Sequence, residues 1–139
     1  MILKEIGIIK SPYKGKERSQ NEKSLSRQIM LLEIKDEFFE GLENLIEGQF
    51  IVVIYWADRA QRNLLKVVPP GKIIESGVFA TRSQNRPNPL SINVVKILAI
   101  EKNKIIVTGL DALDNSPLLD IKPYYALLDE AVEVIEMEL

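Results

Sequence analysis

The sequence contains neither histidine nor cysteine. Without cysteine, a disulfide framework, a thiol nucleophile and a zinc finger are excluded. Without histidine, a Ser-His-Asp triad, an H-E-x-x-H metal site and an imidazole acid or base are excluded as well. We therefore expect no metal site, and any chemistry has to use carboxylates, cationic groups, tyrosine, amides or a cofactor that brings its own reactivity.

Long apolar runs, glycine-rich nucleotide loops and an excess of one charge are also missing. No apolar run approaches the ~20 residues that span a bilayer, and the first residues lack the pattern of a signal peptide. We therefore expect a cytoplasmic protein without a membrane partner. The seven glycines are scattered, which disfavours a Rossmann-type site. The net charge of −2 gives no global attraction to nucleic acid, so such a role needs a local basic face.

The 139 residues, 46% of them apolar, suit one domain that spans residues 1–139. Apolar, β-branched runs predict a series of short strands. The segments concerned are 2–9, 28–34, 50–56, 77–80, 92–100, 105–110, 118–121 and 131–135. Because residues 50–56 are apolar on both faces, we expect them to form a central buried strand.

One helix is expected at residues 36–46, where Phe38, Leu42 and Leu45 form an apolar stripe. Between the first two strands, residues 14–27 hold five Lys or Arg and two Glu, which predicts an exposed loop of local charge +3. Together these elements predict a mainly β fold, a small single-sheet β-barrel or strongly curved sheet with one packed helix.

Two polar stretches are candidates for chemistry. Residues 81–89 contain Arg82, Arg86 and Asn88, and the prolines within this stretch make it rigid. Two fixed guanidinium groups with amides beside them suit a carboxylate or a phosphate. A polar connection whose arginines pair with surface glutamates is an equally acceptable interpretation.

The second stretch covers residues 109–124. Residues 114–117 are more typical of a plain β-turn than of a binding loop. Asp120, Lys122 and Tyr124 follow at a spacing of two, so in a strand they share one face. The pair Tyr55-Trp56 is able to stack on a base, but its place at the end of an apolar strand favours a core position.

Several motifs in this order resemble the YaeB-like/UPF0066 family, also called TsaA-like or TrmO. They are Ile6–Tyr13 (IGIIKSPY), Ser26-Arg27-Gln28, Gly77–Pro89 (GVFATRSQNRPNP) and Leu119–Tyr124 (LDIKPY). The characterised members include an S-adenosylmethionine-dependent methyltransferase. It methylates N6 of the threonylcarbamoyl-modified adenosine at position 37 of tRNA. The resemblance implies a single-sheet barrel, a homodimer, S-adenosylmethionine as cofactor and tRNA as partner.

The resemblance also implies site residues. The expected cofactor-binding residues are Gln28, Asp58, Arg59, Arg82, Ile92, Gly109, Leu110 and Asp111. As hypotheses, Arg82 binds the cofactor's carboxylate or a phosphate, and Asp111 its ribose or amino group. We expect the substrate to contact Arg27, Arg86 and Asn88, and the reaction side to hold Asp120, Lys122 and Tyr124 as catalytic residues.

This chain departs from the family pattern at three places. Family members often have a histidine where this chain has Gly48-Gln49-Phe50, and another where it has Ala57-Asp58. The usual Pro-Ile-Gly is here Pro89-Leu90-Ser91. Two alternatives therefore stand beside tRNA methylation. One is a methyltransferase paralogue that acts on another substrate, and the other is a non-catalytic S-adenosylmethionine-binding module.

Overall fold

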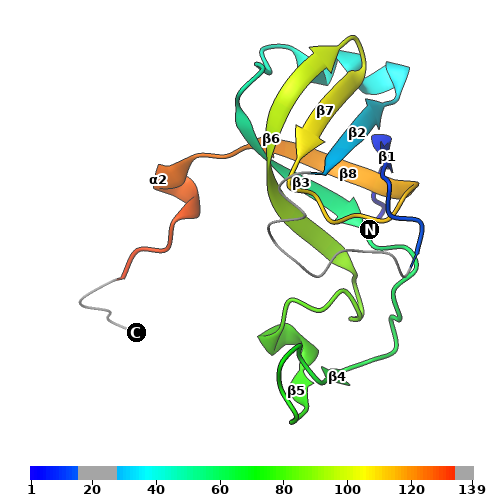
Figure 1. Cartoon of the computed structure of the whole chain (residues 1–139), viewed down its shortest axis with the longest axis vertical. Coiled ribbons are helices and arrows are strands. Elements are labelled where there is room, and N and C mark those ends of the chain that lie inside the picture. Colours follow the sequence, from blue (N-terminus) through cyan, green and yellow to red (C-terminus); the bar gives the residue numbers. More distant parts are fainter. Residues whose placement is uncertain (16–27, 134–139) are drawn as a thin grey trace.

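The computed structural model describes residues 1–15 and 28–133. Within them, six antiparallel strands close into a barrel in the order β1-β2-β7-β6-β3-β8 (Figure 1). The strands are β1 (Gly7–Lys10), β2 (Ile29–Ile34), β3 (Phe50–Trp56), β6 (Leu90–Glu101), β7 (Lys104–Thr108) and β8 (Ser116–Pro123). The predicted mainly β, single-sheet barrel is confirmed.

Alternating side chains of these strands fill the barrel. Ile9, Leu32, Ile51, Val53 and Ile97 are all fully buried in one cluster. The prediction of a central buried strand at residues 50–56 is confirmed, because β3 pairs with β6 on one side and β8 on the other. No helix within the described residues is long and apolar enough to cross a bilayer.

The contact between β1 and β2 requires a glycine at position 7. Gly7 pairs with Ile34, and a Cβ added to Gly7 would lie 2.3 Å from the carbonyl oxygen of Glu33. That distance is shorter than any side chain tolerates, and the obstacle is backbone. On its other side β1 pairs with β8, from Gly7 opposite Leu118 to Ile9 opposite Ser116, and this pairing closes the barrel.

A bulge in β8 decides which of its side chains face outward. Ile54 pairs with Asp120, but the next residue of β3, Tyr55, pairs with Leu118, so β8 carries one extra residue at this point. Leu118 is fully buried and Ile121 packs against the core. Asp120 and Lys122 therefore share the outer wall of the barrel, as predicted, and form a 3.2 Å ion pair there.

The expected helix at residues 36–46 is wrong in type and length. The structure has a 3-10 helix, η1 (Asp36–Leu42). Gly41 lies within it and weakens helix formation, and Asn44 takes a left-handed conformation (φ 75°) that ends it. Phe38 and Leu42 still pack against the core, so the predicted packing of this segment is confirmed.

Several predicted strands need correction at their limits. The first begins at Gly7, not Ile2, because residues 1–5 are exposed and unpaired in the sheet. Residues 77–80 do not form one strand: β5 (Ser76–Gly77) is followed by the 3-10 helix η2 (Val78–Ala80). Residues 131–133 are not a strand, and the rest of the predicted 131–135 strand lies outside the described residues.

Two elements were not predicted from the sequence. The strand β4 (Lys66–Val67) pairs with β5 in a separate two-stranded sheet. This small sheet and η2 belong to residues 61–89, which we call the arm, and the arm extends well away from the barrel (Figure 1). The helix α2 (Ala126–Asp129) follows β8 and projects from the barrel at a different side.

Candidate functional site

The candidate site lies at the end of the barrel where β3 ends and where a connecting segment leads from β7 to β8. The connection, residues 109–115, starts with Gly109 in a left-handed conformation (φ 95°) that suits glycine. Leu110 and Ala112 are fully buried and close this end of the barrel. Asp111, between them, is only partly buried. The buried side chains of Leu110 and Ala112 therefore hold the backbone on both sides of Asp111, whose carboxylate remains accessible.

A buried tyrosine holds that carboxylate. The Tyr55 hydroxyl donates a hydrogen bond to Asp111 Oδ1 at 2.7 Å, and Tyr55 itself is only 2% exposed. A charge-assisted bond of this kind is stronger than a neutral one and restricts the rotation of the carboxylate. The sequence predicted Tyr55 as a core residue, and it also positions a candidate cofactor ligand.

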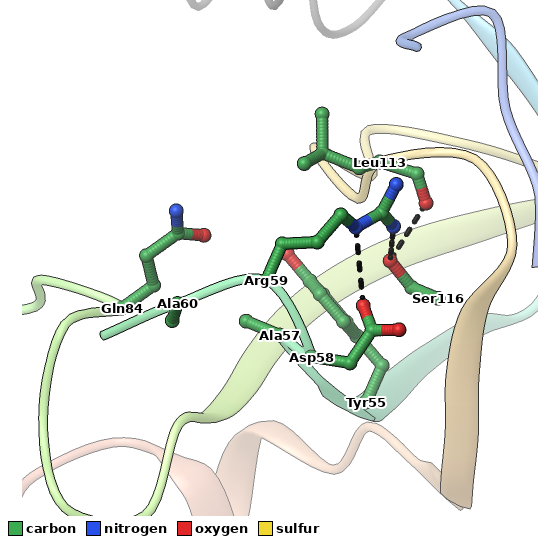
Figure 2. A pocket seen from close by; sticks show the side chains of 8 residues that line it. All are labelled: Tyr55, Ala57, Asp58, Arg59, Ala60, Gln84, Leu113 and Ser116. Carbon is green, nitrogen blue, oxygen red and sulfur yellow. Dashed lines mark hydrogen bonds and ion pairs between the residues drawn. The ribbon is translucent and has the colours of Figure 1, made fainter. Parts of the chain in front are cut away.

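Arg59 ties the same connection to the end of β3. Its Nη2 donates to the carbonyl oxygen of Asp114 at 2.8 Å and to Ser116 Oγ at 3.2 Å. Its Nε donates to Asp58 Oδ1 at 3.2 Å, and the hydroxyl of Ser116 donates onward to the carbonyl oxygen of Leu113 (Figure 2). The guanidinium fork thus donates to three acceptors at once, which a lysine cannot match in geometry.

A small cavity lies beside Arg59. Tyr55, Asp58 and Arg59 line it on one side, and Gln84 from the arm lies across from them (Figure 2). Its volume is about 10 Å³, which is room for at most about one water molecule. A nucleoside-sized ligand therefore has to lie across this opening rather than inside it.

The predicted β-turn at residues 114–117 is confirmed in position, with the turn at Asp114 and Asn115. Asp114 accepts hydrogen bonds from Lys14 Nζ at 2.7 Å and from the backbone N–H of Ser11 at 2.9 Å. The Lys14 ammonium, followed by the Ser11 N–H, lowers the pKa of Asp114 below its ordinary value of 3.8. The turn fastens the segment after β1 to the connection that carries Asp111.

The structure separates the predicted site residues into three groups. The barrel-end group comprises Gln28, Asp58, Arg59, Gly109, Leu110 and Asp111. Gln28 belongs to it because the next residue, Ile29, pairs with Thr108, directly before Gly109. Arg27 lies outside the described residues.

The arm group comprises Arg82, Arg86 and Asn88. Arg86 donates to the carbonyl oxygens of Val78 and Thr81, the latter at 3.0 Å, so its guanidinium holds the arm's own backbone. Asn88 Oδ1 accepts a 3.4 Å hydrogen bond from Arg62. Arg82 is exposed and lines a groove of about 960 Å³ together with Lys72.

The outer-wall group comprises Ile92, Asp120, Lys122 and Tyr124. Ile92 lies on β6 opposite Ile54 and is 50% exposed. Tyr124 directly follows β8, and its backbone N–H donates to the carbonyl oxygen of Phe50 at 3.1 Å. None of the four lines the Arg59 cavity.

Sequence reasoning missed the site contributions of Tyr55, Gln84 and Ser116. Tyr55 ends an apolar run, and Gln84 lies inside a polar one, so neither stands out from its neighbours. In the contacts that join the end of β3 to the connection, Tyr55 bonds Asp111, 56 residues away, and Ser116 bonds Arg59, 57 residues away. Such contacts result from the barrel topology, and local sequence patterns do not predict them.

Comparison with known proteins links this geometry to one family. Residues 8–130 match the model of the tRNA-methyltransferase O N-terminal domain. A protein of Archaeoglobus fulgidus named "S-adenosyl-L-methionine-binding protein" is 46% identical over 129 residues, which is 93% of each chain. A protein of Methanothermobacter thermautotrophicus named "Probable S-adenosyl-L-methionine-binding protein" is 39% identical over 128 residues, 91% of this chain and 92% of that one.

The crystal structure of TrmO from Pseudomonas aeruginosa has the same fold. It superposes with a TM-score of 0.77 at 27% identity and covers 96% of this chain. This chain spans 60% of that crystallised chain. The barrel and its site segments are therefore shared with a protein that has a substantial further part.

Proposed function

The chain belongs to the family of tRNA-methyltransferase O N-terminal domains, and from this premise we propose that it is an S-adenosylmethionine-dependent methyltransferase. As acceptor we propose N6 of threonylcarbamoyl-adenosine 37 in tRNA. The observation that supports the cofactor most directly is the pair of Tyr55 and Asp111, in which a buried hydroxyl fixes an accessible carboxylate. Such a carboxylate suits a ribose diol or an ammonium group.

The other barrel-end residues fit the same ligand. Gln28 offers an amide next to Gly109, and a nucleoside that lies across the Arg59 opening would meet Gln84 from the arm. Arg82, exposed in a cationic groove of the arm, suits a carboxylate or a phosphate. We assign Gln28, Asp58, Arg59 and Asp111 to the cofactor, and the backbone of residues 109–110 to its lining.

The proposed chemistry needs no histidine. When bound, S-adenosylmethionine supplies a methyl group that its sulfonium centre already activates. The acceptor nitrogen forms the new N–C bond while the S–C bond breaks, and that nitrogen then gives up its proton. The protein's task is to orient the two reactants and to accept the proton. We assign the role of proton acceptor to the Asp120 carboxylate. Lys122 lies 3.2 Å from that carboxylate, and Tyr124 follows on the same segment.

We also propose that the protein acts as a homodimer. The outer wall of β6 exposes Leu90, Ile92, Val94 and Leu98, and Phe50 of β3 lies beside them opposite Lys96. Contiguous exposed apolar patches of this kind mark interaction surfaces. A dimer through this wall would bring Asp120 and Lys122 beside the second subunit.

Calorimetric titration with S-adenosylmethionine, followed by methyl transfer, tests this proposal. We expect saturable binding by the wild type, weakened roughly tenfold in Asp111→Asn, and unchanged in Asp36→Asn, a matched change at the opposite barrel end. Purified tRNA with and without the threonylcarbamoyl group then serves as acceptor. Formation of S-adenosylhomocysteine and a methylated nucleoside is expected with the modified tRNA.

Each other outcome has a distinct meaning. Absence of binding at millimolar cofactor would overturn the cofactor assignment and with it the whole proposal. Binding without turnover on either tRNA would contradict tRNA methylation and would favour a binding module or another acceptor. Equal binding by wild type and Asp111→Asn would remove the barrel-end site from consideration.

A further inference from the structure

A second concave surface lies at the opposite end of the barrel. It is a groove of about 570 Å³ between the segment of η1 and the end of β8, a size within the usual range of ligand sites. Its apolar lining includes Ile6, Ile34, Phe38 and Ile121, all of which also contact or belong to the barrel core. It shares no lining residue with the Arg59 cavity.

The rim of this groove is acidic. Glu37, Glu40 and Glu43 all line it, at a spacing of three residues. A 3-10 helix has three residues per turn, so Glu37 and Glu40 lie on the same side of η1, and Glu43, which directly follows the helix, extends this rim. No lysine or arginine lines the groove, and none of the three glutamates has an ion-pair partner among the residues that the structure describes.

The opposite wall holds a fourth carboxylate and an aromatic ring. Asp120 lines the groove but is already paired with Lys122. Tyr125, 54% exposed, completes this wall beyond the end of β8. The groove thus combines an apolar floor with three carboxylates on one rim that the described part of the chain leaves without cations.

The charge of the rim selects among possible occupants. A nucleic acid would bring phosphates against the glutamates, and like charges repel across such a surface. The last residues of this sequence, from the same molecule or from a second copy, would be repelled by the glutamates in the same way. Residues 129–138 contain five acidic residues and no basic one.

We propose that this groove is a docking site for a basic segment of a partner protein, in which an apolar side chain is flanked by lysine or arginine. The apolar side chain would cover Phe38 and Ile121, and the flanking cations would pair with Glu37, Glu40 and Glu43. Helical or extended peptides that use an apolar anchor in a groove are a common mode of recognition. The rim glutamates have no part in the proposed methyl transfer, but Asp120, which we assign to that reaction, also lines the groove. The test below therefore measures peptide affinity and not methyl transfer.

Selection from a display library of random twelve-residue peptides, with the wild-type chain of 139 residues as bait, tests this inference. Enriched peptides are then synthesised, and their affinities are measured by fluorescence anisotropy against four variants. Glu40→Lys/Glu43→Lys reverses the charge of the rim, and Glu75→Lys, with half that change in net charge, is the charge-reversal control on the arm. Tyr125→Ser removes apolar surface from the wall, and Phe79→Ser is its matched control on the arm.

The expected peptides contain at least two basic residues around an apolar one. Their affinity should fall roughly tenfold or more in Glu40→Lys/Glu43→Lys, should fall in Tyr125→Ser, and should stay unchanged in both arm controls. Binding should also weaken as salt rises. Because all the changed side chains are exposed, we expect each variant to fold, and thermal denaturation checks this.

Three results would overturn the inference. The first is a selection in which no peptide is enriched more strongly by the wild type than by Glu40→Lys/Glu43→Lys used as bait. The second is enrichment of acidic or purely apolar peptides. The third is a peptide that binds wild type and Glu40→Lys/Glu43→Lys equally well, since its site would then lie elsewhere.

Discussion

The hydroxyl of Tyr55 and the carboxylate of Asp111 are joined by a 2.7 Å hydrogen bond that links the end of β3 to the connection between β7 and β8. The two residues are 56 positions apart in the sequence. Tyr55 is buried in the core and Asp111 is accessible. The bond therefore restricts the motion of a carboxylate that a ligand is able to reach.

Tyr55→Phe removes the hydroxyl without changing the shape of the ring. We expect the free energy of unfolding to fall by roughly 1 kcal/mol, together with weaker binding of S-adenosylmethionine. Tyr13→Phe is the control, because the Tyr13 hydroxyl is buried without a hydrogen-bond partner in the described part of the chain. Its loss should be neutral or stabilising. Chemical denaturation measures both, and equal effects of the two changes would contradict the role of the Tyr55 bond.

Gly7→Ala should destabilise the barrel strongly. The added Cβ would meet the Glu33 carbonyl oxygen at 2.3 Å, and the two strands have to separate to relieve the overlap. We expect a loss of about 1–3 kcal/mol. Gly41→Ala, in η1 with no atom within 4 Å of the added group, should be neutral or slightly stabilising. A Gly7→Ala protein as stable as wild type would show that β1 and β2 are able to move apart cheaply.

The pKa of Asp114 predicts how stability depends on pH. Because Lys14 and the Ser11 N–H lower this pKa in the folded state, the unfolded chain binds more protons near pH 4. The contribution of Asp114 is therefore present above the ordinary value of 3.8 and is lost as pH falls through the lower folded value. Asp114→Asn should show a smaller loss of stability between pH 6 and pH 3 (roughly the range over which carboxylates titrate). Parallel urea-denaturation profiles for the two proteins would contradict this.

Arg86→Met should loosen the arm while the barrel stays folded. Arg86 donates to the carbonyl oxygens of Val78 and Thr81. In the variant the Thr81 carbonyl oxygen loses this donor, whereas the Val78 carbonyl oxygen keeps the N–H and the hydroxyl of Thr81 as donors. We expect faster amide hydrogen exchange in residues 76–83, with unchanged protection in β3 and β6. Arg82→Met is the control, since Arg82 has no hydrogen bond or ion pair within the described ranges. Equal exchange in the two variants would argue that Arg86 is a ligand-binding residue rather than a structural one.

Much of the barrel was predictable from local pattern. The segment 50–56 is an apolar run that forms β3, and three successive residues of it are buried. Of the predicted strand 105–110, residues 105–108 belong to β7, whose burial alternates, and residues 109–110 belong to the connection to β8. Residues 36–46 show the limit of this reasoning. Their apolar spacing fits an α-helix, but the chain has to cross from the end of β2 to the start of β3, and Gly41 and Asn44 permit a tighter path.

Candidate residues for the site could be named from the sequence, but their arrangement could not. The family resemblance named Asp111 and Arg59, whereas the tyrosine that bonds one and the backbone carbonyl that bonds the other depend on the closed topology. The bulge in β8 is a similar case. Nothing in the local sequence around Leu119 reveals that one residue fits outside the regular pairing.

Closure of the barrel between its first and last strands also constrains how the protein folds during synthesis. Until β8 has left the ribosome, β1 and β3 are both edge strands, because β8 pairs with each of them to close the barrel. Pairing of segments more than a hundred residues apart is slow compared with local structure formation. A chain that still lacks β8 therefore exposes two strand edges, and the emergence of residues 116–123 decides when that exposure ends.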